Sequence, residues 1–143
     1  MTLDPQIIKE TFALAVPIAD QVATKFYENL FQDYPAVIPL FSHVDQKKQQ
    51  SKLINSLVYM VTHLEDSEKL TPFLHNLGSR HTYYGTEEAH YDAVAATLLK
   101  TLAFFLGPKW TPKIEQQWTL LLGVIKTKML EGASQHNAAK KVA

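Results

Sequence analysis

Residues 70–81, LTPFLHNLGSRH, place apolar side chains three and four positions apart and end on a histidine. At this spacing the three leucines share one face of an α-helix, and His81 continues that face one turn later. A buried imidazole without a partner is costly, because burial removes its hydrogen bonds to water. His81 is therefore predicted to be either a metal ligand or a core histidine bonded to a backbone carbonyl, and the spacing leaves both interpretations open.

The same helical spacing recurs along the chain, and proline, glycine or polar residues separate the periodic stretches. We expect one all-α domain over residues 1–143, with a polar tail that frays from about residue 133. Residues 42–48 are expected to form a loop or a frayed helix start, and Gly85 a left-handed helix cap. Helices are expected at about residues 4–17, 18–30, 35–41, 49–64, 68–85, 87–106 and 111–132.

Charge and composition exclude several classes of function. The 14 Lys and Arg residues balance 14 Asp and Glu residues, so no nucleic-acid partner is expected. The chain has no cysteine, which excludes disulfides, a thiolate nucleophile and sulfur-ligated zinc or iron–sulfur sites. Its 5 glycines form no phosphate-binding loop. The chain shows neither a signal peptide nor a long apolar run, so we expect a cytoplasmic protein without stable membrane insertion.

Two polar side chains lie on helical faces that are otherwise apolar. Gln49 precedes Leu53 and Leu57 on one face of its helix, and Tyr27 lies on the core-facing side of another helix. Each has an ordinary interpretation: Gln49 as an exposed helix start, and Tyr27 as a core ring with its hydroxyl at the edge. If both instead face one dry pocket, their donors would stabilise a small ligand with partial negative charge, such as dioxygen.

Three short runs together resemble one protein family. They are FYENLFQDYPAVIPLF at residues 26–41, LGSRH at 77–81 and AHY at 89–91. The combination resembles bacterial single-domain globins and the globin domain of flavohaemoglobins, over roughly residues 3–131. The resemblance implies the all-α globin fold, a three-over-three helical sandwich around a haem pocket, with haem b as the cofactor.

The resemblance also implies roles for individual residues. His81 matches the proximal iron ligand, Tyr27 the distal tyrosine, and Phe41 the phenylalanine that packs on the porphyrin. The distal glutamine falls at Gln49, with Gln50 as the alternative if the loop aligns one residue differently. The other residues that the resemblance places around the haem are Leu53, Leu57, Leu77, Arg80, Tyr91, Val94 and Leu122.

Two positions on the proximal side leave alternatives open. Arg80 lies where the family often has a basic residue near a haem propionate, and a solvated surface charge is its other interpretation. Tyr91 matches a tyrosine that, in flavohaemoglobins, joins a glutamate of the last helix beneath the proximal histidine. That glutamate's place falls on Ala133, and Glu131 comes two residues early. Without the carboxylate, the iron is expected to hold oxygen rather than activate it.

The resemblance implies dioxygen, nitric oxide and carbon monoxide as ligands. Reversible dioxygen binding is the first expected function, and it requires no catalytic residue. Nitric oxide dioxygenation is the second, and it needs a separate reductase, because the chain ends before the flavin- and nicotinamide-binding domains of flavohaemoglobins. A haem-based gas or redox sensor is the third, and in a redox protein His43 could supply a sixth ligand.

Overall fold

The computed structural model describes residues 2–83 and 86–142, so the predicted Gly85 cap lies outside the described residues. Within these ranges every regular element is helical, which confirms the predicted all-α class. None of the described helices combines the length and the apolar character needed to cross a membrane. The elements are α1 (Pro5–Ala15), η1 (Val16–Ile18), α2 (Ala19–Asp33), η2 (Pro35–Phe41), α3 (Gln46–Thr62), α4 (Ser67–Tyr83), α5 (Glu88–Leu106), η3 (Gly107–Lys109) and α6 (Pro112–Val142), where η marks a 3-10 helix.

Side-chain caps explain where α1 and α3 begin. The Asp4 carboxylate accepts a hydrogen bond from a backbone amide of the first turn at 3.0 Å, and Pro5 occupies the first helical position. The Asp45 carboxylate caps α3 in the same way, at 3.0 Å from an amide three residues later. Of the two alternatives predicted for residues 42–48, the helix start holds from Gln46 onward and the loop holds for the residues before it. The helix already begins at Gln46, because the Asp45 cap satisfies a first-turn amide.

The ends of α5 and α6 differ in their chemistry. α5 ends at Leu106, and Gly107 caps it with a φ of 51°, a left-handed conformation that glycine adopts without steric cost. α6 instead continues past Gly132 to Val142, where the sequence predicted a frayed polar tail from about residue 133. Alanine, glutamine and lysine in this stretch favour helical backbone, which accounts for the continuation.

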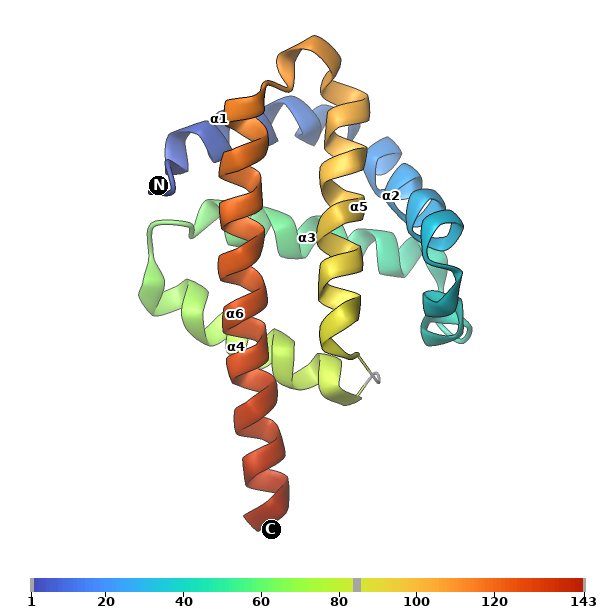
Figure 1. Cartoon of the computed structure of the whole chain (residues 1–143), viewed down its shortest axis with the longest axis vertical. Helices are drawn as coiled ribbons and strands as arrows, with labels where there is room; N and C mark the ends of the chain where they lie inside the picture. Colours follow the sequence, from blue (N-terminus) through green and yellow to red (C-terminus); the bar gives the residue numbers. More distant parts are fainter. Residues whose placement is uncertain (1, 84–85, 143) are drawn as a thin grey trace.

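The helices form two layers. Figure 1 shows α5 and α6 running side by side, with α1, α3 and α4 crossing them, and α2, which packs against α5, slanting away from it. This is the predicted three-over-three sandwich. The layers meet in an apolar core, whose most completely buried large side chains are Trp118, Phe26, Ile8, Leu30, Leu74 and Leu121.

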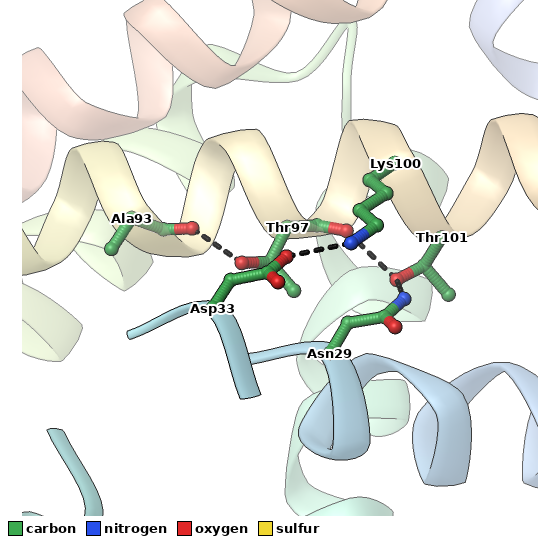
Figure 2. Close-up of polar contacts among 6 residues, drawn as sticks. All are labelled: Asn29, Asp33, Ala93, Thr97, Lys100 and Thr101. Atoms are coloured by element: carbon green, nitrogen blue, oxygen red, sulfur yellow. Dashed lines mark hydrogen bonds and ion pairs between the residues drawn. The ribbon is translucent and has the colours of Figure 1, made fainter. Parts of the chain in front are cut away.

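A buried polar contact joins α2 to α5 (Figure 2). The Asn29 side chain donates to the Thr101 hydroxyl at 3.2 Å, and both residues are buried. Thr97 and Thr101 each donate their hydroxyl to the carbonyl four residues earlier, at 2.7 and 2.8 Å, so their burial leaves no donor unsatisfied. At the exposed end of the contact, Lys100 pairs with Asp33 at 2.7 Å. The buried bond fixes how α2 is set along α5.

Two glycines allow the backbones of α4 and α6 to touch. A Cβ atom on Gly78 would overlap the Met129 carbonyl, and one on Gly132 would overlap the His75 carbonyl. No side chain separates the two helices at these points. The contact sets the position of α4, and with it the position of His81.

The Gly78→Ala variant is expected to lose about 1–3 kcal/mol of unfolding free energy, because its methyl group overlaps backbone atoms that cannot rotate away. Gly123→Ala is the matched control in α6. A Cβ there meets no atom within 4 Å, and alanine favours a helix over glycine by about 0.5–1 kcal/mol. Urea denaturation measures both variants, and equal stabilities would contradict the close contact.

Candidate functional site

Three of the predicted site residues lie together at one end of α2. The Gln49 amide donates a hydrogen bond to the Tyr27 hydroxyl oxygen at 3.2 Å. The Phe41 ring lies edge-on to the Tyr27 ring, with centroids 5.7 Å apart, and Phe31 completes the group at 5.5 Å from Phe41. We call Tyr27, Gln49, Phe31 and Phe41 the tyrosine cluster.

Local structure explains why these side chains meet. Tyr27 lies on the buried side of α2 and is only 5% exposed. η2 starts at Pro35 and turns the chain back after α2, so that Phe41 returns to the Tyr27 ring. Gln49 lies in the first turn of α3, one position before Gln50. The Gln50 side chain instead accepts a hydrogen bond from Thr24 at 3.5 Å, so Gln49 is the glutamine that faces the tyrosine.

The tyrosine cluster has the chemistry of a hydrogen-bond donor site. Burial raises the pKa of Tyr27 above its ordinary value, and the hydrogen bond from Gln49 opposes this only in part. The hydroxyl is therefore protonated at neutral pH. Because its oxygen accepts from Gln49, its hydrogen can be donated to a ligand.

His81 lies near the end of α4 with its ring orientation fixed by the backbone. Its Nδ1 lies 2.7 Å from the Leu77 carbonyl oxygen. A carbonyl only accepts, so Nδ1 carries the proton and Nε2 carries the lone pair in the neutral ring. Burial lowers the pKa of His81, the Leu77 bond opposes this shift, and the nearby Arg80 charge lowers it further. This neutral tautomer is the form that binds metals.

The sequence left His81 either as a metal ligand or as a histidine bonded to the backbone. The structure contains the backbone bond, and that bond orients the ring in the way that a carbonyl orients the ring of a metal-binding histidine when it accepts from the other ring nitrogen. The Tyr91 ring lies beside His81, with centroids 6.5 Å apart. Burial raises the pKa of Tyr91 as well, so its hydroxyl is neutral.

Most of the residues predicted to line a haem leave part of their surface uncovered. Val94 is 37% exposed, Arg80 is exposed, and Leu57 is buried. A planar apolar group would gain roughly 25 cal/mol for each Å² of apolar surface that it covers. With a neutral imidazole on α4 and polar donors on α2 and α3, these residues have the chemistry that haem needs. Five of them are half-buried and pack at the edge of the core: Phe41, Leu53, Leu77, Tyr91 and Leu122.

Glu131, the acidic residue considered for the proximal side, pairs with His75 and Lys128. A Glu131 carboxylate oxygen lies 2.8 Å from His75 Nε2 and 3.6 Å from Lys128 Nζ. The His75 hydrogen bond is the main cause that lowers the pKa of Glu131. Ala133 occupies the position expected for the carboxylate. His75 was not among the predicted site residues, because nothing in its local pattern indicates a pair with a residue 56 positions later.

Comparison with known proteins finds a family model and relatives that agree with the resemblance seen in the sequence. The family model described as Globin matches residues 24–129. The flavohemoprotein of Bacillus subtilis (strain 168) is 30% identical over 122 residues, which cover 84% of this chain and 31% of that protein. Flavohemoprotein B of Dictyostelium discoideum is 30% identical over 118 residues, which cover 80% of this chain and 27% of that protein. The chain spans less than a third of the length of these curated relatives.

The raised pKa of Tyr27 predicts a pH dependence of stability. The folded chain keeps this proton at a pH where an unfolded tyrosine, with a pKa of about 10, has lost it. The stability contributed by the neutral hydroxyl is therefore full below about pH 10 and falls as the pH rises further. Tyr27→Phe should lose less unfolding free energy than the wild type over this alkaline range, as urea denaturation would measure. Parallel losses in both proteins would contradict the raised pKa.

Proposed function

This chain belongs to the globin family, and from that premise we propose that it binds haem b through His81 and holds dioxygen reversibly beside Tyr27 and Gln49. Haem supplies a ferrous iron that takes dioxygen, nitric oxide or carbon monoxide as a ligand. The proposed ligands are these three gases, and the proposed location is the cytoplasm. The chain's own residues orient the ring of the proximal histidine, wall the haem and hold the gas.

The hydrogen bond from Gln49 to Tyr27 is the observation that carries the proposal. Gln49 directs the hydroxyl proton of Tyr27 away from itself, toward a ligand that accepts it. Dioxygen bound by haem would carry partial negative charge, and a fixed donor such as the Tyr27 hydroxyl would stabilise that charge more than water does. Two coupled donors therefore favour slow release of dioxygen.

The proximal side supports retention of oxygen rather than its activation. Nδ1 of His81 donates to the neutral carbonyl of Leu77. A neutral carbonyl attracts the Nδ1 proton less strongly than a carboxylate would. Glu131 is paired with His75, and Ala133 has no carboxylate. The proximal imidazole is therefore weakly polarised, as suits a carrier.

Nitric oxide dioxygenation with a separate reductase is the second candidate. It is favoured by the identity of 30% to flavohemoproteins, which are longer than this chain. Nitric oxide and dioxygen together give nitrate and leave the iron oxidised, so each turnover needs one electron from the reductase.

The Tyr27→Phe and Gln49→Leu variants are expected to release dioxygen several-fold faster than the wild type, because each net hydrogen bond contributes about 1 kcal/mol. In the double variant the two effects should not add, since Gln49 acts through Tyr27. Gln50→Leu, one position along α3, is the matched control. Stopped-flow displacement of dioxygen by carbon monoxide measures the rates. Rates unchanged within about a factor of two in the single variants would refute the donor role.

The His81→Gly variant is expected to lose the wild-type haem spectrum and to regain it when imidazole is added, because the free ring replaces the missing ligand. Ultraviolet–visible spectra of the oxidised and reduced protein measure both steps. His43→Gly is the control, since His43 is exposed in the turn after η2. A wild-type spectrum for His81→Gly without imidazole would show that another group is the ligand.

A further inference from the structure

α6 contacts both of the helices that carry the proximal residues. The backbone of α6 at Met129 touches α4 at Gly78, which lies about one turn before His81. Three residues before Met129, the side chain of Lys126 reaches α5. Positions three apart are neighbours on the surface of a helix, so one short stretch of α6 supports α4 and α5 together.

Lys126 binds two carboxylates at the start of α5. Its Nζ lies 2.7 Å from an Asp92 oxygen and 3.4 Å from a Glu88 oxygen. The hydrogen bond to Asp92 raises the pKa of Lys126 above its ordinary value, so this side chain is charged at neutral pH. The two carboxylates are four residues apart and therefore lie on one side of α5. A single ammonium group thus ties the first two turns of α5 to α6.

The first turn of α5 is also closed by its own side chains. The Glu87 carboxylate accepts a hydrogen bond from the His90 backbone amide, and His90 Nδ1 accepts one from the Glu87 backbone amide at 2.9 Å. This reciprocal pair is a capping box, which gives partners to two amides at the helix start. Tyr91 follows His90 directly, between the two residues that Lys126 binds. Because this turn is a well-defined helix start, a tie to its carboxylates also holds Tyr91.

The position of Tyr91 matters because its ring lies beside His81. The ring centroids are 6.5 Å apart and the ring planes are inclined by 31°. The Leu77 carbonyl holds one ring nitrogen of the imidazole, and the Tyr91 ring limits how far the imidazole turns about that bond. The Glu131 carboxylate of α6 bonds to α4 instead. α6 therefore supports Tyr91 through Lys126, which is bound to the helix that carries the tyrosine.

We propose that Lys126 is a positioning residue, which holds the Tyr91 ring beside the His81 imidazole by tying the start of α5 to α6. The inference rests on the proposed haem function, which makes His81 the iron ligand. The carboxylates that Lys126 binds are largely exposed, so dissolved salt screens these ion pairs. The proximal side of the site is therefore sensitive to ionic strength.

Amide hydrogen exchange of the full chain tests the tie between α6 and α5. Lys126→Met removes the charge and keeps an apolar stem. We expect the backbone amides of residues 92–94, the first with carbonyl partners inside α5, to exchange about two- to five-fold faster in this variant. Lys126→Arg keeps the charge and should exchange as the wild type does. Lys128→Met is the matched control, because Lys128 also lies on α6 and pairs with Glu131.

Salt gives an independent test of the same tie. At about 1 M potassium chloride the screening length is only about 3 Å. We expect the wild-type amides of residues 92–94 to exchange as fast as those of Lys126→Met, whose own rates should change no further. Wild-type rates in Lys126→Met, or equal acceleration in Lys128→Met, would overturn the tie.

Resonance Raman spectroscopy of the ferrous holoprotein tests the effect on His81. The iron–histidine stretching band reports how the imidazole is held against the iron. We expect this band to shift and broaden in Lys126→Met and to regain its wild-type form in Lys126→Arg. Tyr91→Leu should change the band as well, and adding Lys126→Met to it should have no further effect, because Lys126 acts through Tyr91.

The outcomes separate this inference from the proposed function. A chain that takes up no haem, or whose haem is bound by another residue, would refute the proposed function, while amide exchange would still show whether Lys126 ties α5 to α6. Haem binding through His81 with a wild-type iron–histidine band in Lys126→Met would overturn the positioning role alone. Lys126 would then stabilise the start of α5 without acting on the histidine.

Discussion

Gly78 and Gly132 let the backbones of α4 and α6 touch, and the position of His81 follows from that contact. Side chains between two helices usually leave some freedom to slide, whereas carbonyl groups in direct contact leave almost none. α4 therefore holds its histidine in a position set by backbone atoms of α6. The Leu77 carbonyl then fixes the orientation of the ring, so both the position and the angle of the imidazole are determined by main-chain groups.

Burial shifts the pKa values of His81 and Tyr27 in opposite directions, and in both cases it favours the neutral form of the side chain. Burial lowers the pKa of His81, which favours the neutral imidazole, and raises the pKa of Tyr27, which favours the protonated hydroxyl. Water would weaken both effects, because it stabilises the charged form of each group. The amide of Gln49 completes the donor side without adding charge. A neutral set of groups of this kind suits a gas ligand, which gains only partial charge when it binds.

The sequence predicted the fold class and most helix boundaries, because apolar spacing, proline and glycine act over a few residues. It left open whether residues 42–48 form a loop or a helix start, and the Asp45 cap decides this by starting α3 at Gln46. It could not predict that Glu131 pairs with His75, since only the crossing of α4 and α6 brings them together. It also gave no signal for the burial of Thr97 and Thr101, because a hydroxyl that bonds to its own helix behaves as an apolar group. Contacts between distant segments thus limited the prediction of the site more than local structure did.

The bond between Asn29 and Thr101 has a consequence for gas retention. Two residues along a helix correspond to a rotation of roughly 200°, so Asn29 and Tyr27 lie on opposite sides of α2. One side is anchored to α5, and the other presents the hydroxyl. A slip of α2 by one position would leave the buried Asn29 amide without its Thr101 partner and would turn the tyrosine away. If Tyr27 holds the gas as proposed, substitutions on α5 that never contact the ligand can change how long it stays bound, because they change how α2 is anchored.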